Sequence, residues 1–434
     1  MSAITAKASR KMKKYAVLTR EPRCFLGSFD FSWEQRKLGE MGQTYTGLSG
    51  KTKDDFGHGQ ARFVTYMNVF SNPISNPEMT EPIEIDPKQN EVEVGDVFFT
   101  TSSETPEEVG MSSILLEKRG KTYLNSFCFG FRPSEKIDSY YLAYMLRSES
   151  TRAKIILLAQ GISRYNISKN KVMEIAVSLP SLDEQKMIGQ YFSQLDNLIT
   201  LHQRKFEKLT NVKKSMLEKM FPQNGSSYPE IRFKGFTDPW EQRKLSEITD
   251  KVTEKNSGLQ YVETFTNSAE FGIISQRDFF DHDIAKLGSL DGYYIVKNED
   301  FVYNPRISTS APVGPINRNK LGRTGVMSPL YTVFRPHDID TTYLEYFFKC
   351  GYWHSFMNFN GDSGARSDRF SIRDNVFFQM PIPIPDIDEQ RKIGELLTCL
   401  DNLITLHQRK GKAAVSGCFL NCSSIEKVRR KAEL

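Results

Sequence analysis

Residues 183–221 read DEQKMIGQYFSQLDNLITLHQRKFEKLTNVKKSMLEKMF, and this stretch predicts one long helix. A seven-residue period keeps one seam of a helix facing a partner helix, which is the pattern of a coiled coil. The stretch contains no proline; Asp183 offers an N-cap shortly after Pro180. At a rise of 1.5 Å per residue, the helix would be roughly 57 Å long. The period is carried by Ile188, Leu195, His202, Leu209 and Met216, with Leu198 and Val212 at companion positions.

A second copy of this pattern occurs near the end of the chain. Residues 388–410 read DEQRKIGELLTCLDNLITLHQRK, and the segment LDNLITLHQRK is identical in both copies. Ordinary core packing would explain any single amphipathic helix, but an identical repeat favours two equal helices that fold back antiparallel. His202 and His407 occupy equivalent positions, where a polar residue that sets coiled-coil register is favoured over a metal pair. The predicted seam comprises Ile188, Leu195, Leu198, His202, Leu209, Val212, Ile393, Leu400, Leu403 and His407.

The bulk composition is that of a water-soluble globular protein with 434 residues, enough for two or three domains. A net charge of +5 and a pI near 8.6 permit a nucleic-acid partner without requiring one. The six cysteines are scattered, so free thiols in a reducing cytosol are expected. The basic first twenty residues lack the apolar core of a secretory signal, and no run of about eighteen apolar residues predicts a membrane span. We therefore expect a cytoplasmic protein.

The region between the two helices repeats the region before the first. WEQRKL occurs at 33–38 and again at 240–245, and FRP occurs at 131–133 and 334–336. Repeats of this length imply two whole domains. The expected divisions are an N-terminal arm at 1–30, a first domain at 31–180, a helix at 181–222, a linker at 223–239, a second domain at 240–385, a second helix at 386–411 and an atypical tail at 412–434.

Each domain reads as a mixture of strands and helices. VFFTTSS at 97–103 and FVYNPRI at 301–307 predict strands. SYYLAYMLRS at 139–148 and TTYLEYFFKCG at 341–351 have helical spacing. A strand that ends in proline precedes each long helix, and its prolines place it at a sheet edge or in a stiff connector. The fold class is therefore α+β, with two mixed α/β domains in pseudo-twofold tandem repeat joined by a long antiparallel coiled coil.

No complete catalytic or metal site can be named from the sequence. Two GKT triplets, at 50–52 and 120–122, lack the preceding glycine of a phosphate-binding loop. No GxGxxG, HExxH or Cys/His cluster has cofactor or metal spacing. The acidic pairs at 183–184 and 388–389 are explained by the helix dipole. We expect no catalytic residue, no metal and no cofactor bound by this chain.

Basic and amide side chains near turns are instead candidates for contact with DNA. Arginine commonly reads guanine and asparagine or glutamine reads adenine, while lysine and serine hold phosphates. A solvated surface charge is the alternative for any one of them. The candidates are His58, Arg62, Lys118, Arg119, Arg164 and Tyr165 in the first domain, and Arg277, Asn304, Arg306, Asn317, Arg318, Lys320, Arg323, Arg366 and Arg369 in the second.

The arrangement resembles the specificity subunit of type I restriction–modification systems. The repeated WEQRKL, the repeated DEQ(K/R)xIG…LDNLITLHQRK helix and the proline-ended strand before each DEQ carry the resemblance, from about residue 31 to 410. It implies two target recognition domains that each read one half of an asymmetric, bipartite DNA sequence. The repeated helices would also dock two methyltransferase subunits.

The same resemblance divides the work among separate chains. Restriction and translocase subunits would join the complex, and S-adenosylmethionine, ATP and Mg would bind to the partners. This chain would be non-catalytic. A coiled-coil tether that binds proteins without DNA specificity is the alternative function; a free-standing nuclease or methylase is disfavoured by the missing motifs.

The tail departs from the repeat. After Lys410 the first copy's FEKLTNVKKSMLEKMF is replaced by GKAAVSGCFLNCSSIEKVRRKAEL. Gly411 and Gly417 disfavour a helix, so the second helix is expected to be about sixteen residues short. On this interpretation the seam of Leu209, Val212 and Met216 would lack its partner, and restoring the missing stretch would raise thermal stability.

Overall fold

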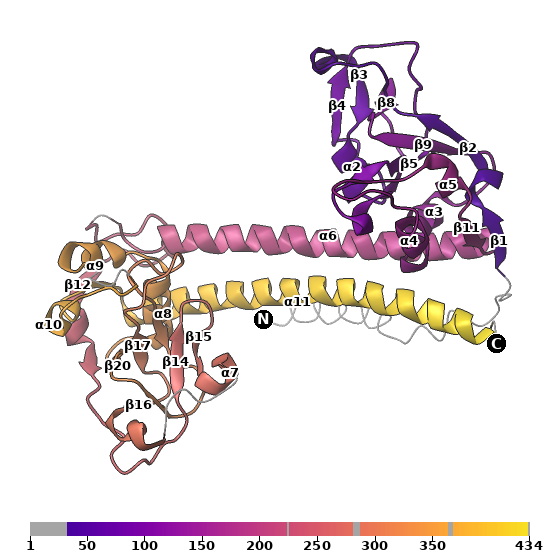
Figure 1. Cartoon of the computed structure of the whole chain (residues 1–434). Coiled ribbons are helices and arrows are strands. Elements are labelled where there is room, and N and C mark those ends of the chain that lie inside the picture. Colours follow the sequence, from indigo (N-terminus) through magenta and orange to yellow (C-terminus); the bar gives the residue numbers. More distant parts are fainter. Residues whose placement is uncertain (1–32, 224, 281–286, 363–367, 433–434) are drawn as a thin grey trace, which may run out of the picture. The chain divides into compact units, whose positions relative to one another are not determined.

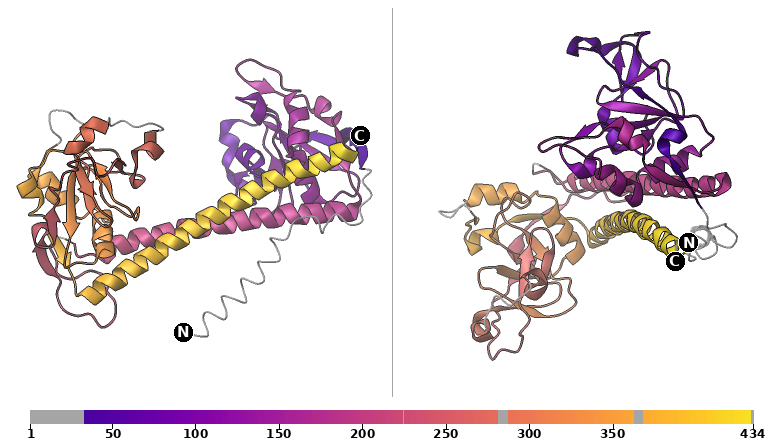
Figure 2. Two further views of the ribbon diagram at one scale, coloured as in Figure 1. Left: turned by 90° about the horizontal axis from the view of Figure 1, so that it is seen from below. Right: turned by 45° about the vertical axis from the view of Figure 1, so that its right-hand side comes forward.

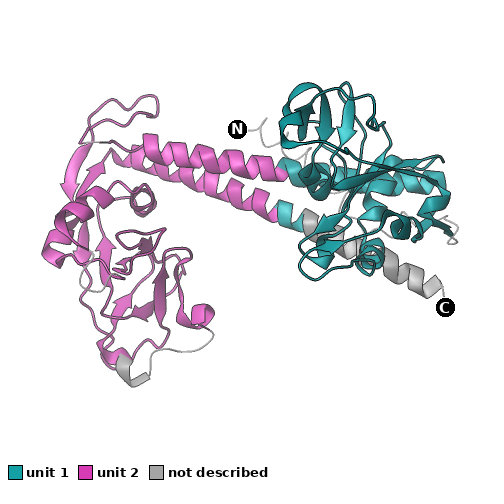
Figure 3. Cartoon of the chain, turned by 45° about the horizontal axis from the view of Figure 1, so that its top comes forward, with its two compact units in different colours: residues 1–201, 410–434 teal, residues 202–409 magenta. Residues whose placement is uncertain are grey.

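The computed structural model describes residues 33–223, 225–280, 287–362 and 368–432, and side chains up to residue 413 except those of 287–289. The chain forms two compact units, residues 1–201 with 410–434 and residues 202–409 (Figure 3). The division falls within two long helices, α6 (Leu182–Lys219) and α11 (Ile387–Ala432), and each of them contributes to both units.

Unit 1 is built on a four-stranded antiparallel sheet of order β2-β9-β5-β7. A three-stranded sheet, β4-β3-β8, lies beside it, and two short pairs, β1 with β11 and β6 with β10, complete the strands (Figure 1). The strands are β1 (Glu34–Lys37), β2 (Gly42–Thr46), β3 (Phe56–Val64), β4 (Thr80–Ile83), β5 (Val97–Thr100), β6 (Ser102–Ser103), β7 (Ser112–Ile114), β8 (Thr122–Leu124), β9 (Cys128–Pro133), β10 (Tyr165–Asn166) and β11 (Ala176–Leu179). The helices before α6 are α2 (Tyr66–Ser71), α3 (Ser139–Leu146), α4 (Glu149–Ile156) and α5 (Lys169–Met173), with 3-10 turns η3 (Leu38–Glu40), η4 (Lys53–Asp55) and η5 (Pro106–Glu108).

Unit 2 repeats the central antiparallel sheet, with order β13-β20-β17-β18. Its further pairs are β12 with β21, β14 with β15 and β16 with β19. The strands are β12 (Glu241–Lys244), β13 (Thr249–Lys251), β14 (Phe265–Ser268), β15 (Gly272–Ser275), β16 (Tyr294–Val296), β17 (Phe301–Tyr303), β18 (Ile316–Arg318), β19 (Gly325–Met327), β20 (Thr332–Pro336) and β21 (Pro381–Ile384). The helices are α7 (Gln276–Phe280), α8 (Thr341–Lys349), α9 (His354–Asn360), α10 (Asp374–Phe377) and α11 (Ile387–Ala432), with η6 (Leu245–Glu247) and η7 (Leu287–Gly292).

The strands and helices predicted from sequence are present in both domains. VFFTTSS forms β5 and β6, FVYNPRI begins as β17, and the two aromatic segments form α3 and α8. The proline-ended segments form β11 and β21, each paired with one strand, which agrees with an edge position. Those partner strands are the EQRK segments of the two WEQRKL motifs, in antiparallel register from Glu34 opposite Leu179 and from Glu241 opposite Ile384. The motif therefore forms the first strand of each domain, and this strand pairs with the last strand of the same domain.

The helix pairing is antiparallel within unit 2. The later half of α6 lies along the first half of α11, as Figures 1 and 2 both show. His202 and His407 are in contact, with their Nδ1 atoms 2.9 Å apart. Farther along, Lys213 Nζ lies 2.5 Å from Asp401 Oδ1. The residue numbers run in opposite directions, as the predicted coiled coil requires.

The prediction that Leu209, Val212 and Met216 lack a partner is wrong. All three pack against the apolar core of unit 2, which includes Ile393 and Leu400. In an antiparallel pair, the end of the first helix meets the start of the second, so the altered tail does not face these residues.

The second helix is also not short, since α11 has 46 residues and α6 has 38. A single glycine costs a helix only about 1 kcal/mol relative to alanine, so Gly411 does not end it. The predicted N-cap is wrong as well, because Asp183 lies inside the first turn of α6. Ser181 precedes the helix, and its Oγ accepts a bond from the Glu184 N–H at 3.4 Å.

Each long helix has a glycine at the point where it crosses a short helix of its domain, which is α3 for α6 and α8 for α11. A Cβ atom on Gly189 would lie 2.6 Å from the Tyr141 nitrogen and 2.7 Å from Asp138 Oδ1. On Gly394 it would lie 3.1 Å from Thr342 Cγ2. The IG in both DEQ-containing repeats is therefore explained by close approach of α6 to α3 and of α11 to α8.

Candidate nucleic-acid interface

A buried aspartate that pairs with a partly exposed arginine fixes the central sheet of each domain. In unit 1, Arg132 donates to both carboxylate oxygens of Asp96, each at 2.8 Å. In unit 2, Arg335 makes the same two bonds to Asp300, also at 2.8 Å. Both aspartates are 1 % exposed. Each aspartate directly precedes the equivalent strand, β5 or β17, and each arginine lies on the equivalent strand, β9 or β20. The two domains therefore share one framework.

The framework is attached to the long helices by the residues of the repeated DEQ segment. Gln185 Oε1 accepts from the Asp138 N–H at 3.0 Å, and Gln390 Oε1 accepts from the Asp340 N–H at 2.9 Å. Each glutamine also donates to a proline carbonyl at the end of the preceding strand, at 2.9 Å in both units. The sequence repeat at these positions therefore reflects domain anchoring.

One further pair attaches each domain to the repeated segment of its long helix. Tyr144 donates to Asp196, and Tyr346 donates to Asp401, both at 2.8 Å. These aspartates belong to the identical LDNLITLHQRK segment. Sequence reasoning assigned that segment to the seam and missed this anchoring role, although each tyrosine stands in a repeated YLxY.

In unit 2, the glutamate of the DEQ segment is buried against the linker. Glu389 is 1 % exposed, and Arg232 donates to its two oxygens at 2.8 Å each. Trp240 Nε1 adds a third bond at 3.2 Å. The segment predicted as a linker is thus fixed to the start of α11.

The seam residues fall into several environments. Leu209, Val212, Ile393 and Leu400 join the core of unit 2, and Ile188 packs against the core of unit 1. The side chains of Leu195 and Leu198 are half-buried. Leu403, in contrast, is 37 % exposed and does not belong to the buried stripe.

Three first-domain candidates come together beside β3 and β8. Arg62, Lys118 and Arg119 line one small hollow. Each has a partner already: Arg62 Nε donates to Thr80 Oγ1 at 2.6 Å, Lys118 bonds Glu91 at 2.7 Å, and Arg119 lies 2.8 Å from Glu78. Arg119 is the most exposed of these three side chains, with 60 % of its surface accessible.

The other first-domain candidates lie elsewhere. His58 is exposed on β3, with Nε2 2.9 Å from the Asp54 carbonyl oxygen. The guanidinium of Arg164 lies over the ring of Phe127 at 5.8 Å, and Tyr165 pairs with Ser103 in the β6–β10 ladder. The structure therefore divides the six candidates between the β3 region and the β6–β10 region.

In the second domain, an amide network supports the chain just after β17. Asn317 donates to Asn267 Oδ1 at 2.7 Å, and Asn267 donates to the Val302 carbonyl at 2.7 Å. Asn304 donates to the Asn267 carbonyl at 2.8 Å, and its Oδ1 accepts from the Arg306 N–H at 3.0 Å. Asn304 and Asn317 therefore position the loop that presents Arg306, and their amides are engaged within the protein.

Arg306 and Arg369 are exposed and directly opposite each other in an isolated antiparallel bridge. The bridge is flanked by two backbone bonds, from the Ile307 N–H to the Asp368 carbonyl at 3.0 Å and from the Phe370 N–H to the Pro305 carbonyl at 2.7 Å. Sequence reasoning named both arginines as candidates but could not place them together, because they are 63 residues apart in the sequence.

Arg318 has a different role. Its side chain is 8 % exposed and lies 2.9 Å from Glu299 and 2.6 Å from Glu345. Burial raises the pKa of Glu345, but Lys349, Arg318 and Lys320 outweigh it, so that the pKa lies below its ordinary value. Arg318 is thus committed to the interior, where it cannot also contact a base.

The remaining second-domain candidates are on the periphery. Lys320 is 58 % exposed and lies 3.3 Å from Glu345. Arg323 donates to both oxygens of Glu263 at 2.8 and 2.7 Å, and this pairing lowers the pKa of Glu263. Arg277 lies on α7. Arg366 lies outside the described residues.

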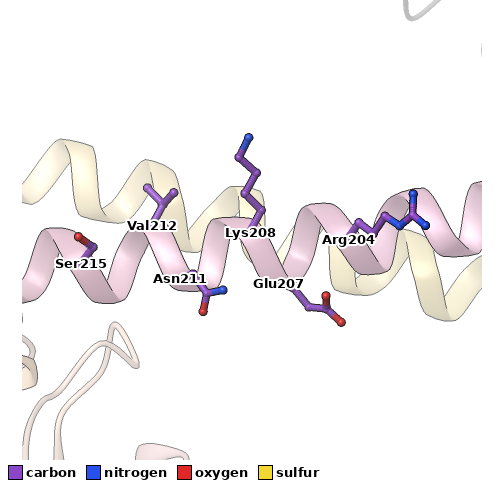
Figure 4. Close-up of a pocket in the computed structure, with 6 residues that line it drawn as sticks. All are labelled: Arg204, Glu207, Lys208, Asn211, Val212 and Ser215. Atoms are coloured by element: carbon purple, nitrogen blue, oxygen red, sulfur yellow. The ribbon is translucent and has the colours of Figure 1, made fainter. Parts of the chain in front are cut away.

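No cluster of three or more His, Cys, Asp or Glu side chains that could hold a metal occurs among the described residues. None of the described helices is long and apolar enough to cross a bilayer. A shallow hollow lies along α6 within unit 2 (Figure 4) and is lined by Arg204, Glu207, Lys208, Asn211, Val212 and Ser215. Its lining comes from a single helix, so it is a surface feature and not an enclosed small-molecule site.

Comparison with known families agrees with this architecture. The model of the type I restriction modification DNA specificity domain matches residues 32–211 and 237–415, so the chain belongs to that family. The two matches start one and three residues before the WEQRKL motifs and extend through the identical helix segments. The chain is therefore a DNA sequence-recognition protein of the type I restriction–modification class and not an enzyme in its own right.

Curated relatives carry the corresponding names. The type I restriction enzyme MjaVIII specificity subunit of Methanocaldococcus jannaschii is 26 % identical over 312 residues, 68 % of this chain and 71 % of the relative. The putative type I restriction enzyme MjaX specificity subunit of the same organism is 24 % identical over 410 residues, 89 % and 90 % of the two chains. The crystal structure of a type I restriction–modification system S subunit from M. genitalium has the same fold, with a TM-score of 0.51, 12 % identity and coverage of 90 % of this chain and 94 % of that one.

Proposed function

We propose that each of the two domains reads one half of an asymmetric, bipartite DNA target. The observation that supports this proposal is that the domains share the Asp–Arg, Tyr–Asp and Gln–carbonyl contacts but differ in the side chains around them. A common framework gives both domains the same way of approaching a duplex. Different side chains on that framework then select different bases, because sequence is read by contacts to base edges.

The long helices act in this proposal as the spacer and as the docking surface for two methyltransferase subunits. The exposed side of α6 around Arg204, Lys208 and Asn211 supports docking, because these side chains are exposed and α6 buries its opposite side in unit 2. Restriction and translocase subunits complete the assembly. The chain itself binds no cofactor, while S-adenosylmethionine, ATP and Mg are taken up by the partners, and the complex acts in the cytoplasm.

The test is methylation of a random DNA library by this chain together with its methyltransferase subunits. A split recognition sequence with two different halves is expected, and footprinting of the complex on that sequence is expected to protect both halves. Methylation without sequence preference, or protection of a single continuous site, would refute the proposal. The first of these outcomes would favour the protein-binding tether without DNA specificity.

A further inference from the structure

One surface position is equivalent in the two domains but differs in chemistry. The sheet registers align β5 with β17, because Val97 is opposite Phe131 and Phe301 is opposite Phe334. Downstream of these strands, the Ile167 N–H donates to the Thr101 carbonyl at 3.0 Å, and the Phe370 N–H donates to the Pro305 carbonyl at 2.7 Å. Counting from these bonds, the Ser102–Asn166 pair of unit 1 corresponds to the Arg306–Arg369 pair of unit 2.

In the second domain, this pair places two positive charges together at the surface. Directly opposite residues on antiparallel strands have Cβ atoms about 4.5–5.5 Å apart, and like charges in such positions destabilise the pair. Among the described residues, neither guanidinium has a hydrogen bond or an ion pair, in contrast to Arg318, Arg323 and Arg335. The unfavourable arrangement is relieved when an acceptor lies between or beside the two groups.

In the first domain, the same position carries one buried hydroxyl residue and one exposed amide. Ser102 is 4 % exposed, and its carbonyl accepts from the Tyr66 hydroxyl at 2.7 Å. Asn166 is exposed. The backbone pairing is thus retained while the charge changes by two units.

We propose that this cross-strand position determines the recognised bases in both domains, and that Arg306 and Arg369 read guanine in the second half-site. The inference rests on the proposed bipartite recognition. Both half-sites have the same phosphate backbone, so a position that binds phosphate is expected to carry cations in both domains. This position carries two arginines in the second domain and no cation in the first. Guanine offers O6 and N7 as paired acceptors for an arginine fork, whereas adenine suits an asparagine such as Asn166.

The experiment compares Arg306→Lys, Arg369→Lys and Arg369→Ala with the parent chain, each assembled with the methyltransferase subunits. Lysine keeps the charge but loses the bidentate fork. Both lysine variants are expected to lose discrimination at guanines of one half-site by about 5- to 150-fold, with the other half-site unchanged. Asn166→Ala is expected to alter only the opposite half-site.

Lys297→Ala serves as the charge control, because Lys297 is an exposed cation of unit 2 that pairs with Glu254 at 3.2 Å. It is expected to leave the recognised sequence unchanged. The inference is overturned if the lysine variants keep the parent sequence while Arg369→Ala weakens binding to all sequences and lowers the salt slope by about one, which is the signature of a phosphate contact. If the parent complex shows no split sequence, the proposed function fails before any variant is considered.

Discussion

The buried Glu389 gives the sharpest test of how the second domain is held to its helix. Glu389→Gln keeps an acceptor for Trp240 but removes the charge that faces Arg232, whose side chain is only 14 % exposed. Breaking a buried ion pair by removing one partner costs about 3–5 kcal/mol, because the other charge remains buried. For a unit of this size, that loss corresponds to a fall in melting temperature of roughly 6–20 °C.

The matched control is Glu184→Gln, at the same position of the first repeat. Among the described residues, no arginine or lysine pairs with Glu184, and burial raises its pKa above the ordinary value. Removing a carboxylate whose charged form is disfavoured is expected to change the free energy of unfolding by less than about 1 kcal/mol.

Urea unfolding monitored by tryptophan fluorescence measures both variants, since Trp240 contacts Glu389 directly. We expect a clear fall in the unfolding midpoint for Glu389→Gln and almost none for Glu184→Gln, with the slope unchanged. Equal losses in the two variants, or a loss below about 1 kcal/mol for Glu389→Gln, would contradict the assigned role of the ion pair.

Three other outcomes are expected. Gly189→Ala should destabilise the chain by about 1–3 kcal/mol through overpacking, because its new Cβ would lie 2.6 Å from a backbone nitrogen. Gly394→Ala should cost clearly less, because the nearest atoms, Thr342 Cγ2 and Cβ at 3.1 and 3.2 Å, need to move by only a few tenths of an ångström; thermal unfolding separates the two variants, and equal losses would contradict the difference in close approach. Burial raises the pKa of Glu345, but Lys349 and Arg318 lower it by more, so that the net pKa lies below its ordinary value. Its ion pairs therefore stabilise the fold above about pH 4.5 and lose that contribution as the pH falls through the depressed pKa; unfolding midpoints between pH 6 and 3.5 should fall less steeply in Glu345→Gln than in the parent. Arg318→Ala should lower stability by about 3–5 kcal/mol without changing the methylated sequence, and an altered sequence from a stably folded variant would restore Arg318 as a base reader.

Local periodicity was sufficient to predict the main elements. The seven-residue pattern from Ile188 to Met216 marks α6, and the apolar run at 97–100 marks β5, because these signals lie within one continuous stretch. The identical LDNLITLHQRK segments also predicted antiparallel pairing. They did not reveal which end of one helix meets which part of the other, so the missing-partner prediction for Leu209 was wrong.

The arrangement of the candidate surface could not be derived in the same way. Nothing in the local sequence distinguishes Arg318, which is buried between two glutamates, from Arg306, which is exposed. That difference depends on contacts with α8 and with the segment around Arg369, which are distant in sequence. The position of Arg306 opposite Arg369 is likewise a product of tertiary pairing.

The joining of β1 to β11 and of β12 to β21 has an evolutionary consequence. Since the first and last strands of each domain are hydrogen-bonded neighbours, the chain enters and leaves at nearly the same point on its helix. The residues from Leu38 to Ile175 in the first domain, and from Leu245 to Met380 in the second, form one continuous insertion between two paired strands. Recombination at these two short strands can therefore replace the whole segment between them; on the proposed function, such an exchange would change the recognised half-site and leave the long helices as they were.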